Sequence, residues 1–431
     1  MSTAGSEYRL DGIYKQRQDG FYMQRVKLPA GVVSASQART IAAVSTRFGQ
    51  GTVHLTTRGS MEIHWLKEED LPQVKRELAM TGLTSRGACG GAVRGITCGS
   101  QGAHGFPIIE TLARRLQRHF TGNPRFERLP KKFKIGIEAD VVGGRHLIQD
   151  VGLVLAGIDG GRARYDLWIA GGLGREPQAA FLFVENLAEE RIIPVIEAIL
   201  RVYTAHAPPP KRLKFLAKEF GEAKLCQLIK AEATFSEEIP EVSGIHENFI
   251  TAVNDHNRLE LPVFAGKLTA AQLAIIADRA EICADGVLMV TANQDIALQL
   301  LPDVDAAAEL SILQQQTGLT SAGSAPALRV CPGNHECLMG LTATRDVARE
   351  LLAHIGMQGR KLTWALSGCQ NSCTQPQLAD IGIVSSTMVK GEDGVRTPRF
   401  DLYRSTGEGL GTAAGCAHTL DELCGKVREI G

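Results

Sequence analysis

The sequence predicts an internally duplicated α+β protein, and three observations lead to this fold class. Laid on itself at an offset of about 235 residues, the chain comes into register, so that Gly31 falls on Gly266 and Asp166 on Asp401. The aligned stretches share one pattern: a strand, a turn, an amphipathic helix, a glycine turn and a second strand. The chain has 431 residues, more than one hydrophobic core usually holds. We therefore expect two related copies, each with more than one domain.

Each copy begins with a small α+β unit. Residues 36–48 and 269–283 carry apolar side chains at helical spacing, and residues 52–65 alternate as a strand does. Units this small rarely bury enough apolar surface alone, so we expect the two to pair about a pseudo-twofold axis. Residues 208–221 and 234–246 have the proline, charge and Ser/Glu content of polar connectors. Larger α/β domains follow the small units, and the expected domain ranges are 14–80, 81–235, 245–317 and 318–431.

Composition and charge argue against several classes of protein. The 47 basic and 47 acidic residues balance, which argues against a general nucleic-acid binder. No run of about 18 apolar residues is present, which argues against a membrane protein. Residues 1–18 carry charges instead of an apolar signal segment, and the ten cysteines fit reduced thiols. We therefore expect a cytoplasmic protein without a nucleic-acid or membrane partner.

Four cysteines form two spaced pairs near the end of the chain. Cys331 and Cys337 have the spacing C-x5-C, and Cys369 and Cys373 have the spacing C-x3-C. Two tight turns that each present two sulfurs can deliver four thiolates to a cubane iron-sulfur cluster. Zinc sites favour C-x2-4-C, which the first pair does not match, and disulfides need an oxidising compartment. Four unrelated buried cysteines remain as the plainer alternative.

Four further stretches accompany the cysteines in a fixed order: LTTRGSMEIHW at 55–65, RGACGGAVRGITC at 86–98, LPKKFK at 129–134 and VTANQD at 290–295. Together with the cysteines they resemble the siroheme and 4Fe-4S sulfite/nitrite reductase family, over most of the chain. The resemblance implies two ferredoxin-like half-domains paired about the pseudo-twofold, plus two larger α/β domains that hold siroheme and the cluster. It also implies that Cys373 both ligates the cluster and bridges it to the siroheme iron.

The same resemblance assigns roles to four cations. Lys132 and Lys134 alternate, which on a strand puts them on one face; alone, they are also typical of a solvated strand edge guarded by lysines. With Arg58 and Arg94, they match the residues that surround the distal face of siroheme in the family. These residues are expected to hold a small oxyanion, and the lysines to deliver protons to it.

Other positions match the family more loosely. Asn293 and Gln294 resemble siroheme contacts, and Arg212 resembles a basic residue that contacts a siroheme carboxylate. The alternatives are a strand-end turn for the first two and a solvated helix face for Arg212. His64 and His335 are either hydrogen-bond donors near the site or satisfied core histidines.

The sequence indicates that electrons come from another protein. GEGLGTAAG at 407–415 contains a GxGxxA match, but a lone match is weak evidence of dinucleotide binding. Its counterpart in the first copy, GGLGR at 171–175, lacks that fingerprint. An external donor, ferredoxin or a flavoprotein, is therefore expected.

The leading interpretation is a siroheme-dependent enzyme that reduces sulfite to sulfide with six electrons. Reduction of nitrite to ammonia on the same site is a close alternative, and Gly59 and Glu62 stand where the family commonly has glutamine, which leaves the substrate open. A precorrin-3B synthase-like oxygenase shares the duplication and the cysteines, but the intact LPKKFK disfavours it. An electron-transfer or scaffold subunit without a working haem predicts loss of the four cations, which are all present.

Overall fold

The computed structural model describes residues 3–233, 257–319 and 326–430. These residues form two compact units, each assembled from several stretches of chain. The first unit comprises Met1–Gly12, Ser85–Gly172 and Pro177–Asp255, and the second comprises Ile13–Thr84, Leu173–Glu176 and His256–Gly431. The sequence predicted four continuous domains, whereas the structure divides into two discontinuous units. The four domain ranges therefore stay predictions.

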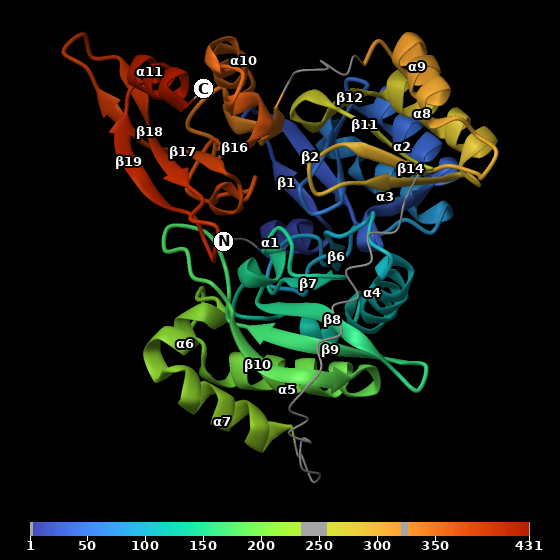
Figure 1. The fold of residues 1–431 in the computed structure, drawn as a ribbon, viewed down its shortest axis with the longest axis vertical. Coiled ribbons are helices and arrows are strands. Elements are labelled where there is room, and N and C mark those ends of the chain that lie inside the picture. Colours follow the sequence, from blue (N-terminus) through green and yellow to red (C-terminus); the bar gives the residue numbers. More distant parts are fainter. Residues whose placement is uncertain (1–2, 234–256, 320–325, 431) are drawn as a thin grey trace. The chain divides into compact units, whose positions relative to one another are not determined.

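The first unit is built on one mixed sheet with the strand order β10-β9-β8-β7-β6 (Figure 1). The strands β6, β7 and β8 run parallel, and β8, β9 and β10 run antiparallel. The strands are β6 (Thr97–Cys98), β7 (Ile135–Glu138), β8 (Val151–Asp159), β9 (Arg162–Ile169) and β10 (Phe181–Ala188). The helices are α1 (Thr3–Leu10), α4 (Phe106–Phe120), α5 (Ile192–His206), α6 (Leu213–Phe220) and α7 (Glu222–Glu232).

The second unit contains both small half-domains. The strands of the first are β1 (Ile13–Lys15), β2 (Phe21–Val26), β3 (Val32–Ser34), β4 (Thr52–Leu55) and β5 (Met61–Lys67), and its helices are α2 (Ala35–Phe48) and α3 (Leu71–Met80). The second half-domain has β11 (Arg258–Leu261), β12 (Lys267–Thr269), β13 (Val287–Val290) and β14 (Ile296–Gln299), with helices α8 (Ala270–Cys283) and α9 (Ala306–Thr317).

The half-domains exchange strands reciprocally. β3 joins the sheet of the second copy, where Val33 pairs with Leu288, and β12 joins the sheet of the first copy, where Leu268 pairs with Val53. The helices α2 and α8 pack against each other. This arrangement confirms the predicted duplication and the pairing of half-domains about a pseudo-twofold.

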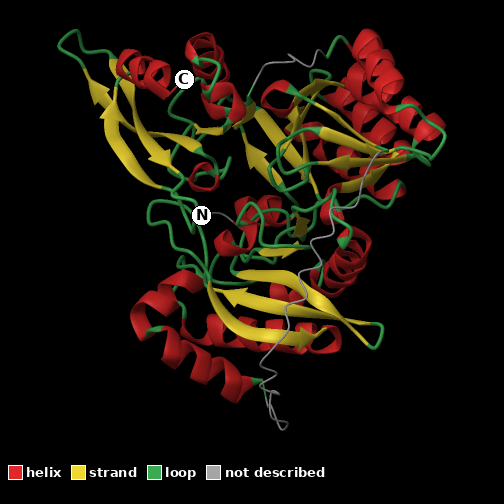
Figure 2. Ribbon diagram, viewed as in Figure 1, coloured by secondary structure: helices red, strands yellow, loops and turns green. Residues whose placement is uncertain are grey.

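The rest of the second unit repeats the topology of the first unit's sheet. Its strand order is β15-β16-β17-β18-β19, with β15, β16 and β17 parallel and the remainder antiparallel. Figure 2 distinguishes the helices and strands of the chain by colour. Its strands are β15 (Ala327–Val330), β16 (Thr363–Ser367), β17 (Ile381–Lys390), β18 (Arg396–Arg404) and β19 (Thr412–His418). The helices α10 (Thr344–His354) and α11 (Leu420–Ile430) pack on a core that contains the fully buried Trp364 and Phe400.

Three local expectations had different outcomes. Residues 52–65 form two strands, β4 and β5, because the chain turns back between them at Gly59, whose φ is +62°. The expected connector at 208–221 contains helix α6, so that expectation was wrong for most of its length. The expected connector at 234–246 lies outside the described residues. Among the described helices, none has both the length and the apolar character to cross a membrane.

Candidate functional site

The cysteine loops begin at the carboxyl ends of two neighbouring parallel strands. Cys331 follows β15 directly, and Cys369 follows β16 after one glycine. The last residues of these strands lie side by side, since Val330 pairs with Leu366. Parallel pairing therefore brings both loops, each with its second cysteine, to one edge of the sheet.

The two loops touch each other through their backbones. Leu341 N–H donates to Gly368 O at 2.7 Å, and Gly368 N–H donates to Cys331 Sγ at 3.1 Å. A Cβ on Gly368 would lie 3.0 Å from Gly333 Cα of the other loop, and one on Gly340 would lie 2.3 Å from Gly333 C of its own loop. The second loop can approach the first this closely only because residue 368 is glycine, and the first loop can turn back on itself only because residue 340 is glycine.

The four thiols share one electrostatic environment, because the charges of some act on the others. Burial, followed by the charges of Cys373 and Cys337, raises the pKa of the Cys331 thiol. Burial, Cys373 and Cys369 raise the pKa of Cys337 to about 11. Thiolates crowded in this way need a cationic partner, and an iron-sulfur cluster supplies one. The four residues therefore fit the cluster that the sequence predicted.

The loop of Cys373 is fastened to the turn that carries Arg58. Thr57 Oγ1 donates to Cys373 O at 2.7 Å, and Gln375 Nε2 donates to Thr57 O at 3.3 Å. Ser372 adopts a left-handed φ of 53° beside the exposed Cys373. The half-buried Arg58 thus follows a residue that is bonded directly to the loop of the fourth cysteine.

Three of the predicted cations lie on adjacent segments of the first unit. Val93 and Phe133 form a parallel bridge, and Arg94 N–H donates to Phe133 O at 2.8 Å, so Arg94 runs beside Lys132 and Lys134. The Arg94 guanidinium donates to Gly90 O at 3.0 Å and to Ala88 O. Arg58 belongs to the second unit, so a pocket formed by all four cations stays a prediction.

The remaining predicted siroheme contacts have partners within their own units. Arg212 is buried and donates to Asp150 Oδ2 at 2.8 Å and to Gly171 O at 3.2 Å. Asp150 Oδ2 also accepts from Lys134 N–H at 2.8 Å, which links Arg212 to the lysine segment. The role of Arg212 toward siroheme stays a prediction.

Gln294 forms hydrogen bonds to the last residues of β4 and β15. Its amide accepts from Val330 N–H at 2.8 Å and donates to Leu55 O at 2.9 Å and Val330 O at 3.1 Å. Asn293 is half-buried, and its N–H donates to Thr291 Oγ1 at 3.2 Å. Contacts of either residue with siroheme also stay predictions.

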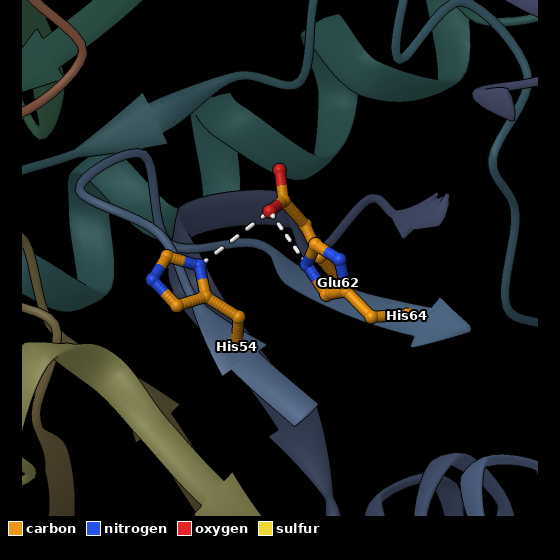
Figure 3. Close-up of side chains that lie close together, drawn as sticks. All are labelled: His54, Glu62 and His64. Carbon is orange, nitrogen blue, oxygen red and sulfur yellow. Dashed lines mark ion pairs between the residues drawn. The ribbon is translucent and has the colours of Figure 1, made fainter. Parts of the chain in front are cut away.

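Sequence reasoning missed a buried polar cluster on β4 and β5. His54, Glu62 and His64 point toward one another (Figure 3), and Arg25 Nε donates to Glu62 Oε1 at 2.9 Å. Although burial opposes it, Arg25 and the two imidazoles hold the pKa of Glu62 well below its usual range. The alternation of Glu62 and His64 was visible in the sequence, but their approach to His54 depends on the pairing of β4 with β5.

Glu336, the residue before Cys337, belongs to another buried ion pair. Arg345 donates to Glu336 at 2.7 and 2.9 Å. His335 is half-buried; burial, followed by the charge of Arg345, lowers its pKa. Its carbonyl accepts from Gln18 Nε2 at 2.6 Å, which ties the segment after β1 to the cysteine loop.

Two family descriptions match the chain. Residues 14–81 match the nitrite/sulfite reductase ferredoxin-like half domain, and residues 97–237 match the nitrite and sulphite reductase 4Fe-4S domain. The chain belongs to the nitrite and sulfite reductase family. Members of this family are oxidoreductases. The 4Fe-4S match covers the sheet of the first unit, whereas the paired cysteines follow the equivalent strands of the second unit.

Relatives of this reductase chain include enzymes named for either substrate. The present chain is 26% identical to ferredoxin sulfite reductase 1 of Mycolicibacterium paratuberculosis, in an alignment that covers 100% of this chain and 84% of the relative. It is 27% identical to the assimilatory ferredoxin-dependent nitrite reductase of Haloferax mediterranei, covering 94% and 77%. It is 28% identical to the ferredoxin–nitrite reductase of Synechococcus elongatus, covering 94% and 84%.

The fold of the reductase also matches a solved structure. The structure of Mycobacterium tuberculosis NirA protein matches with a TM-score of 0.80 at 24% identity, over 99% of this chain and 87% of that one. The match confirms the predicted α+β sulfite/nitrite reductase fold.

Proposed function

We propose that this chain reduces sulfite to sulfide, using siroheme and a 4Fe-4S cluster. The observation that carries the proposal is the convergence of the two cysteine pairs at the ends of β15 and β16. Cys331, Cys337, Cys369 and Cys373 would hold the cluster, and Cys373, whose loop is bonded to Thr57, would also ligate the siroheme iron. When bound, these groups supply one-electron transfer and an iron that binds the anion.

The chain's own residues then bind the anion and move protons. Arginines offer planar paired donors to an oxyanion, which suits Arg58 and Arg94. Lysines are titratable proton sources, which suits Lys132 and Lys134. Hydrogen sulfite, six electrons and six protons give hydrosulfide and three waters, so repeated proton delivery is required. The reduced thiols that the cluster needs fit a cytoplasmic protein.

The electrons come, on this proposal, from an external one-electron donor, ferredoxin or a flavoprotein. Several relatives carry ferredoxin in their names, which supports the first of these donors. Nitrite reduction to ammonia is the second candidate activity, because relatives named as nitrite reductases match at similar identity. RGACGGAVRG at 86–95 resembles the sulfite-type loop slightly more closely, which favours sulfite.

The experiment is turnover of sulfite and of nitrite by the purified holoenzyme, with reduced methyl viologen as donor. Lys134→Met is expected to keep the visible spectrum and to lower sulfite turnover by about 10²-fold or more, the usual contribution of a positioned proton donor. Lys131→Met is the matched control, since Lys131 is exposed in the same KKFK stretch. If Lys134→Met and Lys131→Met both turn over like the wild type, the substrate site is misplaced. Preference for nitrite, with ammonia as product, would favour the second activity.

A further inference from the structure

The buried cluster of His54, Glu62 and His64 has the composition of a metal site. Its members come from one face of two paired strands: His54 of β4 lies opposite Glu62 of β5, and His64 is two residues beyond Glu62. Relative exposures are 4%, 4% and 6%, respectively. One ligand atom from each residue lies within 4.8 Å of the other two (Figure 3).

The nitrogens that face Glu62 are not satisfied by hydrogen bonds. His54 Nδ1 and both ring nitrogens of His64 are buried and have no hydrogen-bond partner among the described residues. Glu62 Oε2 lies 3.4 Å from His54 Nδ1 and 3.4 Å from His64 Nε2. Buried polar atoms normally have partners, so unsatisfied nitrogens aimed at a common oxygen point to a missing partner.

The spacing suits an ion at the centre of the cluster. Zinc bonds to imidazole nitrogen and carboxylate oxygen are about 2.0–2.2 Å long, and two ligands of a tetrahedral ion lie about 1.6 times that distance apart. The expected separation of ligand atoms is therefore about 3.3–3.6 Å. Both 3.4 Å separations from Glu62 Oε2 fall within this range.

Neighbouring side chains orient two of the ligands. Arg25 binds Glu62 Oε1 and leaves Oε2 for the ion, as outer partners of metal-bound carboxylates do. Gln294 Nε2 lies 3.4 Å from His54 Nε2, and its amide orientation is fixed by the N–H of Val330.

Nearby positive charge limits the affinity without excluding the ion. Arg25 is paired with Glu62, and Arg345, which lowers the pKa of His54 after the larger effect of burial, is paired with Glu336. Neither cation is therefore an uncompensated charge facing the ion.

We propose that His54, Glu62 and His64 bind one divalent transition-metal ion of the zinc type, separate from the cysteine cluster and independent of the proposed reaction. The ion would join β4 to β5 through side chains, in addition to the backbone ladder. Imidazole and carboxylate ligands suit zinc and its neighbours, whereas calcium and magnesium prefer oxygen ligands alone.

The test is zinc stoichiometry, measured by elemental analysis after dialysis of the holoenzyme against a zinc buffer. The preparation carries its full iron and sulfide, so that the four cysteines are occupied. Wild type is expected to retain one zinc per chain, and His54→Gln, Glu62→Gln and His64→Gln are each expected to lose it. His354→Gln is the control, because Glu350, His354 and Cys424 form the other candidate metal group among the described residues.

A second measurement keeps the proposal testable if the variants fold poorly. X-ray absorption at the zinc edge of the wild type should show a shell of nitrogen and oxygen with imidazole scattering. A sulfur shell, an empty wild type, or loss of zinc in His354→Gln but not in His64→Gln would overturn the proposal. None of these readouts depends on turnover, so they fail or succeed separately from sulfite reduction.

Discussion

Two buried arginines near the site are each paired with a carboxylate of the same compact unit. Arg345 is paired with Glu336 in the second unit, and Arg212 with Asp150 in the first. Such pairs add little net stability because desolvation offsets much of their attraction, but removing one partner leaves a buried charge that costs about 3–5 kcal/mol. They therefore fix the geometry of the segments beside them more than they stabilise the fold.

Glu138, at the end of β7, is a buried carboxyl group whose negative charge is only partly balanced by neighbouring groups. Its Oε2 accepts from Ser100 Oγ at 3.2 Å. Burial raises the pKa of Glu138 from its ordinary value of 4.5 to about 7, and the charge of Arg145 only partly opposes this. The ionised form is thus disfavoured in the folded protein relative to the unfolded chain.

This shift predicts a pH dependence of stability with a definite sign. Below pH 4.5 the carboxyl is protonated in both states, and between pH 4.5 and about 7 only the unfolded chain ionises, so the free energy of unfolding falls as pH rises. The loss reaches at most about 3 kcal/mol at neutral pH. Glu138→Gln should abolish this component. Denaturant unfolding of both proteins at pH 5 and pH 8 measures it; equal pH dependence in the two would contradict it.

At the scale of elements, the helices of the half-domains were predictable because their signals are local. Ser34 with Gln37 and Thr269 with Gln272 form capping boxes at the starts of α2 and α8, and both pairs are visible in the sequence. The turn at Gly59 was not predicted, because glycine is required there by a contact with a distant segment. A Cβ on residue 59 would lie 2.9 Å from Gly31 Cα. Helix α6 was missed because its proline-rich, basic flank resembles a connector.

In the candidate site, too, local motifs were predictable and contacts between distant segments were not. The cysteine pairs and the lysine stretch were predictable because each is a short motif. The cluster of His54, Glu62 and His64 was not, since it depends on which strands pair and in which register. The bracing of Gln294 against Leu55 and Val330 likewise joins segments far apart in the chain, and no local pattern predicts it.

The strand exchange between half-domains predicts an effect on stability. Leu268 of β12 is fully buried beside Val53 of β4, so Leu268→Ala leaves a cavity at the junction of the copies. We expect a loss of about 2–5 kcal/mol in the free energy of unfolding. Lys267→Ala changes the exposed neighbour on the same strand and should cost no more than about 0.5 kcal/mol. Denaturant unfolding compares the two; equal effects would show that the exchanged strand is not part of the stabilising core.

At the scale of the whole molecule, the five-stranded sheets of the two copies have the same topology. They differ in the residues that follow the parallel strands. After β15 comes Cys331, and after β6 comes Gly99. A Cβ on Gly99 would lie 2.3 Å from Glu138 Oε2, so the carboxylate of β7 fills the space beside that loop. The first copy therefore has a buried carboxyl group where the second presents thiols.

This divergence predicts that only the second copy binds the cluster, although the 4Fe-4S family description matches residues 97–237 of the first. Cys331→Ser removes a thiol at the end of β15 and should sharply lower non-haem iron and acid-labile sulfide. Cys98→Ser is the matched control, because Cys98 ends the equivalent strand β6 and its buried thiol has a pKa well above the usual range, chiefly through burial. A thiol held protonated in this way is a poor metal ligand, so the control should keep its iron and sulfide. Chemical analysis of both variants decides the matter: equal losses from Cys98→Ser and Cys331→Ser would mean that the cluster draws on both copies.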